Sequence, residues 1–317
     1  MTPYATELAA GIRRGHPRSV ARAISLVERR DPSVDLIIRQ IGGATLPAHV
    51  VGITGAPGAG KSTTVSALTS AYREIGWRVG ILAVDPSSPF TGGALLGDRI
   101  RMRDHALDPE VFIRSMASQG HLGGLSAAVP QALRILEGAG CRVVLIETVG
   151  VGQSEVEVSG VADTTVVVLT PGMGDGIQAS KAGVLEIGDI FAVNKSDVDG
   201  ASTTVRDIQR MIALDPTVAA ATWRRPVVRT RADTGDTGSL VQALTDRWEW
   251  LQTYDALTIK RVARTALELE ARVLDSVRED LRAVDGEHAL DALAAAVTRG
   301  ELDPAAAASL LRQRLSG

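Results

Sequence analysis

Seven short apolar runs recur along the middle of the chain, separated by segments in which apolar residues have helical spacing. The runs are continuous rather than alternating, which is typical of strands buried on both faces of a parallel sheet. The pattern therefore predicts an α/β fold, with a mostly parallel sheet and helices on both faces. Ligands of such folds bind at the carboxyl ends of the strands. The runs are residues 49–54, 79–84, 111–115, 142–147, 164–170, 189–194 and 226–230.

The stretch before the first run has a different pattern, in which apolar residues lie three or four positions apart and charged residues fill between them. Leu8 and Ile12 form one such set, and Val20, Ile24 and Val27 form another. Apolar residues gather again at 36–41, just before a glycine pair. This spacing indicates amphipathic helices. Residues 1–46 are therefore predicted to be a helical N-terminal extension packed on a central domain of residues 47–252.

The end of the chain, residues 253–317, is predicted to be a helical arm. An apolar stripe at three- and four-residue steps indicates one long helix, and two shorter helical segments follow. Asp303 and Pro304 are a typical N-cap and first helical residue of the last segment. The stripe needs a cover, which is either the chain's own domain or a second subunit. Its residues are Ile259, Val262, Ala266, Leu269, Val273, Val277 and Leu281.

Composition narrows the class of protein. The 317 residues are 45% hydrophobic but only 3% aromatic, so the core must be aliphatic. A net charge of −3 provides no electrostatic footprint for nucleic acid or an anionic membrane. The single cysteine, Cys141, rules out a disulfide framework and suits a reducing cytosol. No apolar run approaches the roughly 20 residues that span a bilayer. These features predict a cytoplasmic protein.

A phosphate-binding loop follows the first run. The segment GAPGAGKS matches the pattern G-x-x-x-x-G-K-[ST] in full, in a strand–loop–helix context. Backbone N–H groups of such a loop converge on phosphate oxygens, while Lys61 reaches the β- and γ-phosphates and Ser62 offers a hydroxyl to Mg²⁺. The predicted nucleotide-binding residues here are Gly55, Ala56, Pro57, Gly58, Ala59, Gly60, Lys61, Ser62 and Thr63.

A base-reading motif, NKSD, follows the sixth run, at residues 194–197. The Asp197 carboxylate can accept hydrogen bonds from the ring N–H and the exocyclic amine of guanine together, which adenine cannot offer. Asn194 and Lys195 complete the motif, and the Lys195 stem can lie along the ring face. After the seventh run, Thr230, Arg231 and Ala232 occupy the place of a loop whose backbone contacts the guanine oxygen. Arg231 departs from the usual Ser-Ala pattern there.

Carboxylates follow two further runs and predict a metal site with switch loops. Asp85 ends the second run, and Glu147 ends the fourth. Mg²⁺ needs only one or two carboxylates besides phosphate and water, so Ser62, Asp85 and Glu147 are the candidate metal residues. Residues 85–102 are too rich in Gly, Pro and Ser for regular structure and read as a switch loop that contains Asp98 and Arg99. A second mobile loop, residues 170–183, contains Asp175 and Lys181.

The candidate catalytic residues are Lys61, Asp98 and Glu147. The predicted reaction is in-line attack of water on the γ-phosphorus of GTP, with Lys61 and Mg²⁺ neutralising the developing charge. Val151 stands where a fast GTPase has a water-orienting Gln. This predicts slow intrinsic hydrolysis that a partner accelerates, with Gln153 and Arg99 as possible helpers.

Together these motifs resemble those of the MeaB/ArgK family of P-loop GTPases, over nearly the whole chain. The most specific are GAPGAGKS, DPSSPFTGGALLGDRIRM, IETVGVGQSE, GMGDGIQASKAG and NKSD. The family belongs to the group named for a glutamate in the third G motif, which Glu147 matches. The resemblance implies a homodimer through the C-terminal arm. It also implies an adenosylcobalamin-dependent acyl-CoA mutase as partner, usually methylmalonyl-CoA mutase, whose cofactor loading the GTPase gates and which it protects or reactivates.

Roles carried over with the resemblance fall on the residues already singled out. Lys61 and Ser62 resemble the phosphate and Mg²⁺ holders, and Asp85 and Glu147 the carboxylates around the metal. Asp98 lies in the first switch loop. Asp175 and Lys181 lie in what resembles an additional switch that relays the nucleotide state to the mutase.

Three rival functions stay open. A nickel- or cobalt-insertion GTPase would carry a His- and Cys-rich segment, whereas the five histidines are scattered and Cys141 is alone. An ATP-using kinase of an amino-acid transport system is disfavoured by NKSD. A binder that uses GTP without turnover is the third.

Overall fold

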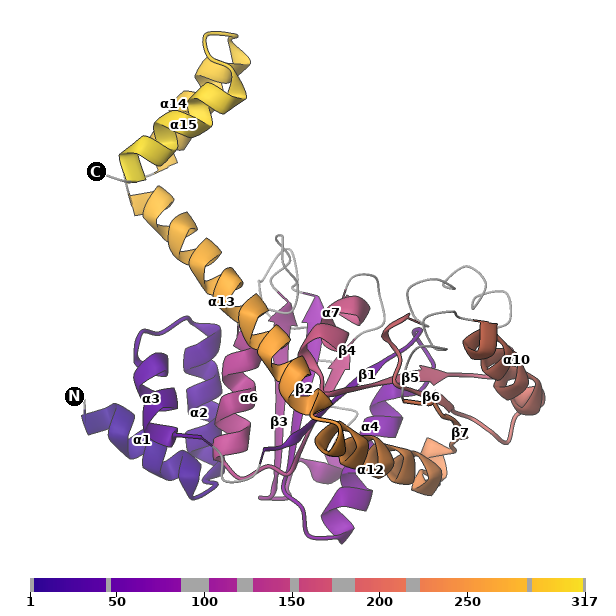
Figure 1. Cartoon of the computed structure of the whole chain (residues 1–317). Helices are drawn as coiled ribbons and strands as arrows, with labels where there is room; N and C mark the ends of the chain where they lie inside the picture. Colours follow the sequence, from indigo (N-terminus) through magenta and orange to yellow (C-terminus); the bar gives the residue numbers. More distant parts are fainter. Residues whose placement is uncertain are drawn as a thin grey trace. The chain divides into compact units, whose positions relative to one another are not determined.

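The computed structural model describes residues 3–43, 47–86, 103–118, 128–148, 154–172, 186–214, 223–283 and 287–315. Seven strands form one parallel sheet in the order β3-β2-β4-β1-β5-β6-β7, so all seven predicted strands are confirmed, as is the fold class (Figure 1). The strands are β1 (His49–Thr54), β2 (Val79–Pro86), β3 (Val111–Ser118), β4 (Val143–Thr148), β5 (Thr164–Leu169), β6 (Ile190–Val193) and β7 (Val227–Arg229).

The centre of the sheet fixes where a ligand can bind. β1 lies between β4 and β5, with Ile53 paired to Glu147 on one side and to Val166 on the other. Every residue of β1, β4 and β5 is buried, as the continuous apolar runs predict. Because all strands are parallel, their carboxyl ends share one edge of the sheet.

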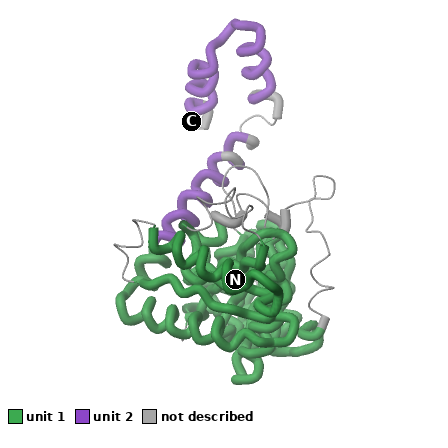
Figure 2. The backbone as a smooth tube through the Cα atoms, turned by 90° about the vertical axis from the view of Figure 1, so that its right-hand side faces the viewer, with its two compact units in different colours: residues 1–262 green, residues 263–317 purple. Residues whose placement is uncertain are grey.

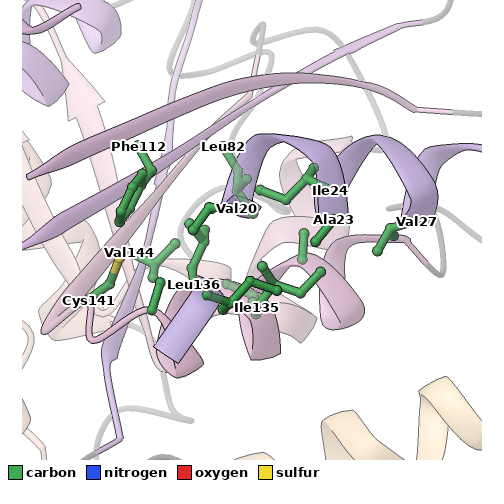
Figure 3. Packing of buried hydrophobic residues seen from close by; sticks show 14 of the residues in the cluster. Val20, Ala23, Ile24, Val27, Leu82, Phe112, Ile135, Leu136, Cys141 and Val144 are labelled. Atoms are coloured by element: carbon green, nitrogen blue, oxygen red, sulfur yellow. The ribbon is translucent and has the colours of Figure 1, made fainter. Parts of the chain in front are cut away.

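Two hydrophobic clusters cover the two faces of the sheet, since alternate residues of each strand point to opposite faces. One cluster joins β2, β3 and β4 to α2 (Pro17–Glu28) and α6 (Ala128–Gly138); Figure 3 shows Leu82 and Phe112 of the sheet with Ile24 and Leu136 of the helices. The other cluster joins the sheet to α4 (Lys61–Glu74) and α12 (Gly238–Thr253). Two smaller clusters bring α10 (Ala201–Leu214) against β5, β6 and β7.

The N-terminal residues form the predicted helices α1 (Pro3–Arg13), α2 and α3 (Ser33–Ile41). Most of their predicted apolar positions are buried, with Ile12 and Ile24 among the largest fully buried side chains, while Leu36 and Ile38 are partly buried. Arg114 of β3 also ties α2 to the sheet, because its guanidinium pairs with Glu28 and donates to Ser25 Oγ at 2.9 Å. This helical layer shares one core with the sheet, as the amphipathic spacing predicts.

A buried ionic network lies at the amino ends of β5 and β6, away from the ligand edge. Asp163 is 1% exposed and accepts from the Val50 N–H at 3.0 Å and from Arg261 Nη2 at 2.7 Å. Lys260 donates to the Asp163 carbonyl at 3.0 Å and to an Asp189 carboxylate oxygen at 3.2 Å. These contacts fasten the first residues of α13 (Ala256–Ala283) to the sheet.

Residues 1–262 and 263–317 form two compact units (Figure 2). The second contains most of α13, with α14 (Glu287–Thr298) and α15 (Pro304–Leu315), which contact each other. The Asp303 carboxylate caps α15, accepting from the N–H groups of Ala305 and Ala306 at 2.9 Å. The predicted division at residues 46 and 252 stays a prediction.

The apolar stripe of α13 is open to solvent in the single chain. Leu269 is 60% exposed and Val273 is 62% exposed, whereas core side chains are below 10%. Among the described helices, none is long and apolar enough to cross a membrane.

Candidate nucleotide-binding site

The loop of residues 55–60 connects the end of β1 to the start of α4, at the ligand edge of the sheet. Lys61, the first residue of α4, is 7% exposed, and its Nζ donates to the carbonyls of Gly55 at 2.8 Å and Ala56 at 3.1 Å. The ammonium is thus held against the loop by carbonyl groups. The N-terminus of α4 adds its partial positive charge at the same place, which makes this loop suited to phosphate.

Two glycines of this loop have conformations or neighbours that exclude a side chain. Gly55 has φ +139°, and a Cβ there would lie 2.2 Å from the Val168 carbonyl oxygen of β5. Gly60 has φ +93°, and a Cβ there would lie 2.3 Å from Asn194 Nδ2. Glycine is required at both positions because positive φ and close backbone approach both disfavour Cβ.

Ser62 and Glu147 come together beside this loop, although they are 85 residues apart. Ser62 Oγ donates to Glu147 Oε1 at 2.5 Å, and Glu147 is only 6% exposed. A serine hydroxyl and a carboxylate are hard oxygen donors of the kind that Mg²⁺ prefers, so these two residues fit that ion. Asp85 is the penultimate residue of the neighbouring β2, two positions beyond the residue paired with Glu147. Its side chain lies outside the described residues.

Asn194 connects three loops of the site. Its side chain is 3% exposed; Nδ2 donates to the Ala59 carbonyl at 3.0 Å, and Oδ1 accepts from the Ala232 N–H at 3.1 Å and from Thr230 Oγ1 at 3.3 Å. The phosphate loop, the NKSD motif and the loop after β7 are therefore fixed relative to one another. The NKSD motif alone did not predict this structural role of Asn194.

The remaining NKSD residues face the same region. Lys195 has φ +55° and its Nζ donates to the Gly58 carbonyl at 3.1 Å. Asp197 has a side chain 45% exposed, and its Oδ1 lies 3.6 Å from Arg231 Nε. The main-chain link from Ser196 N to the Thr230 carbonyl, at 3.1 Å, keeps the two loops adjacent.

The predicted site residues that remain are Thr63 and the residues of the switch loops. Thr63 is exposed on α4. The switch residues Asp98, Arg99, Gln153, Asp175 and Lys181 lie outside the described residues. Their assignments stay predictions.

Two contacts behind the phosphate loop had no signal in residue spacing. Thr64 Oγ1 donates to the Gly60 carbonyl at 2.9 Å, which closes the first turn of α4. His105 is 8% exposed, and its Nε2 lies 3.0 Å from Ser66 Oγ on α4. Neither contact could be found without the three-dimensional arrangement.

Within the described part of the chain, no group of three or more His, Cys, Asp or Glu residues is placed to hold a metal ion by itself. A site made of one hydroxyl and one carboxylate suits an ion whose other ligands are phosphate oxygens and water. The geometry therefore fits a nucleoside triphosphate with Mg²⁺.

Comparison with known proteins agrees with this geometry. The sequence profile of the family described as Methylmalonyl Co-A mutase-associated GTPase MeaB matches residues 20–285. A protein of Pyrococcus horikoshii that is named a GTPase is 42% identical over 313 residues, which is 98% of this chain and 98% of the relative. A Caenorhabditis elegans protein named methylmalonic aciduria type A homolog, mitochondrial, is 36% identical over 212 residues, which is 62% of this chain and 53% of the relative.

A solved structure described as a LAO/AO transport system kinase shares the fold. Its TM-score is 0.70 at 24% sequence identity, and the match covers 100% of this chain and 99% of that one.

Proposed function

This chain belongs to the MeaB family of GTPases, and from that premise we propose that its GTP cycle serves an adenosylcobalamin-dependent acyl-CoA mutase. The client we propose is methylmalonyl-CoA mutase, and the chain gates the loading of its cofactor and protects or reactivates it. In this proposal the chain acts in the cytoplasm, as a homodimer held together by its C-terminal arm.

The hydrolytic step uses groups at the ligand edge of the sheet. Lys61 Nζ, which donates to the Gly55 and Ala56 carbonyls, would move onto the β- and γ-phosphate oxygens of GTP. Ser62 and Glu147 would hold Mg²⁺, which when bound neutralises charge on the β- and γ-phosphates. Water attacks the γ-phosphorus in line, the bond to the β-phosphate oxygen breaks, and GDP and phosphate leave.

The observation that carries the regulatory part of the proposal is the Ser62–Glu147 hydrogen bond. Glu147 lies near the end of β4, immediately before the segment with Val151 in place of a water-orienting Gln. A Mg²⁺ ion would bind a lone pair of the Ser62 hydroxyl, which could still donate its hydrogen to Glu147, so the presence of the ion would reach the Glu147 carboxylate through Ser62. Glu147 is thereby suited to sense the nucleotide and to pass its state to the residues that follow it.

The identity of the partner is supported by the family description and by the name of the Caenorhabditis elegans relative. The exposed apolar stripe of α13 supports the proposed dimer, because large apolar side chains such as Leu269 and Val273 are stabilised by burial. We assign partner coupling to Asp98, Arg99, Gln153, Asp175 and Lys181.

A capture experiment tests the proposal. The chain is immobilised and exposed to purified methylmalonyl-CoA mutase with a non-hydrolysable GTP analogue, with GDP, or without nucleotide. We expect the retained amount of mutase to depend on the nucleotide. Glu147→Ala should abolish that dependence, while Glu249→Ala, which removes an exposed carboxylate on α12, should preserve it. Absence of capture in all three states would contradict the choice of partner.

A competition assay separates the remaining alternatives. If ATP displaced bound GDP as well as GTP does, the chain would be an ATP-using enzyme and the guanine assignment would be wrong. If GTP bound without turnover while nucleotide-dependent capture persisted in Glu147→Ala, the chain would be a GTP-binding protein without turnover. It would then not be a GTPase whose state changes on hydrolysis.

A further inference from the structure

Arg231 lies between two carboxylates at the edge of the base-reading site. Its Nε is 3.6 Å from Asp197 Oδ1 and 3.5 Å from Asp233 Oδ1. The Arg231 side chain as a whole is 43% exposed, but the Nε atom itself is buried and has no hydrogen-bond acceptor among the described residues. The guanidinium therefore acts on both carboxylates through its charge rather than through a fixed hydrogen bond.

The backbone holds Arg231 firmly at this position. The Arg231 N–H donates to the Asp236 carbonyl at 2.9 Å, and the Asp236 N–H donates back to the Arg231 carbonyl at 3.1 Å. Thr230 before it and Ala232 after it are both bonded to the buried Asn194 side chain. The base of the arginine side chain is thus part of the same rigid scaffold as the phosphate loop.

A bound guanine would change how strongly Arg231 interacts with the Asp197 and Asp233 carboxylates. In the free protein Asp197 and Asp233 are 45% and 65% exposed, so water screens the repulsion between them and an exposed ion pair adds little. A base that covers the Asp197 carboxylate displaces that water, and the remaining charges then interact more strongly. A cation between the two carboxylates offsets this repulsion and restrains the Asp197 side chain.

We propose that Arg231 is a positioning residue of the base site, which holds the Asp197 carboxylate for two N–H donors and sets how strongly the chain prefers guanine. The inference rests on the proposed role of Asp197 as the guanine reader. A backbone contact between this loop and the guanine oxygen would not depend on the Arg231 side chain. The inference gives that side chain a role of its own.

Inosine diphosphate is the probe that isolates this effect. Hypoxanthine keeps the ring N–H of guanine but lacks the exocyclic amine, so only one donor reaches Asp197. If the Asp197 carboxylate is no longer held in place, its hydrogen bond with the second donor, the exocyclic amine, weakens first. The ratio of GDP affinity to IDP affinity therefore reports on the orientation of Asp197. A general distortion of the loop would instead weaken the binding of both nucleotides equally.

The experiment measures GDP and IDP binding by calorimetry in five proteins: the unmodified chain, Arg231→Met, Arg231→Lys, Asp197→Asn and the control Arg229→Met. Arg229 is a neighbouring arginine that bonds Ser202 Oγ at 3.0 Å on the exposed side of β7. We expect Arg231→Met to lower the GDP/IDP affinity ratio by about fivefold. Arg231→Lys should retain most of the ratio, and Arg229→Met all of it.

The outcomes distinguish the inference from the assignment on which it rests. If Asp197→Asn collapses the GDP/IDP ratio but Arg231→Met leaves it unchanged, the role of Arg231 is refuted and the guanine reader stands. If Asp197→Asn leaves the ratio unchanged, Asp197 does not read the base and both ideas fall. The double variant Arg231→Met/Asp233→Asn adds a second test, since removing the repelling carboxylate should restore part of the ratio lost in Arg231→Met.

Discussion

Replacing Asn194 by Ala removes the side chain that connects the three loops of the nucleotide site. The amide bonds the carbonyl of Ala59, the N–H of Ala232 and the hydroxyl of Thr230. Ala59 and Ala232 are 1% and 5% exposed, so water cannot easily replace the lost partners. Asn194→Ala therefore leaves buried main-chain groups without hydrogen bonds.

The size of the effect follows from these three bonds. A typical intramolecular hydrogen bond contributes about 1 kcal/mol net, and a buried group left unsatisfied costs more than that. The free energy of unfolding should therefore fall by about 3 kcal/mol. GDP affinity should fall as well, because the phosphate loop and the base loop are no longer held at a fixed separation.

Urea unfolding followed by tryptophan fluorescence measures the first quantity, and calorimetric titration with GDP measures the second. Gln242→Ala is the matched control, because its amide donates to Asp246 at 2.7 Å on an exposed helix face; it should change stability by less than about 0.5 kcal/mol. Asn194→Asp keeps the shape but turns the donor to the Ala59 carbonyl into an oxygen, so it should also be destabilised. A loss below about 1 kcal/mol with unchanged GDP affinity would refute the role of Asn194 as the link between loops.

Three further predictions concern the core and the phosphate loop. Arg261→Met removes a cation that pairs with the buried Asp163 carboxylate. The free energy of unfolding, measured by urea titration, should therefore fall by about 3 kcal/mol. Burial lowers the pKa of His49 from its ordinary 6.5 to about 4, so the unfolded chain binds this proton more tightly than the folded chain. Stability should therefore decline as the pH falls from about 6.5 toward 4, by about 2 kcal/mol between pH 7 and pH 5, in urea titrations at both pH values. Gly60→Ala should displace Asn194 and weaken GDP binding measured by calorimetry, since the added Cβ meets Nδ2 at 2.3 Å.

Each of these predictions has a control within the chain. Arg299→Met removes a cation from an exposed pair with Glu301 and should leave the unfolding midpoint unchanged. His49→Gln should lose the pH-dependent component, and an equally steep decline in that variant would assign it to other groups. Gly160→Ala adds a Cβ with no atom within 4 Å and should keep full GDP affinity. Equal losses in Gly60→Ala and Gly160→Ala would contradict the steric explanation.

The sheet could be predicted from sequence because burial on both faces leaves a simple mark, a continuous apolar run. β7 is only three residues long at the edge of the sheet and is partly exposed, yet its short apolar run was still enough to predict it. The phosphate loop was equally accessible, since its glycines and Lys61 lie within one short segment. In both cases the information is local, and local information survives in a single sequence.

What could not be predicted depends on residues that are far apart in the chain. Glu147 was expected near the metal, but its contact with Ser62 spans 85 residues and depends on how β4 lies beside β1. The pairing of Asp163 with Arg261 spans 98 residues, and either residue alone resembles an ordinary surface charge. The sequence showed that Arg231 departs from the usual loop pattern, but only the structure places its guanidinium between two carboxylates.

The central claim is that this GTPase is slow alone and is driven by its client. The most direct test is the steady-state rate of GTP hydrolysis by the purified chain with Mg²⁺, with and without methylmalonyl-CoA mutase. We predict slow turnover in isolation and an acceleration of at least about tenfold when the mutase is added. Fast turnover by the isolated chain that the mutase leaves unchanged would contradict the account.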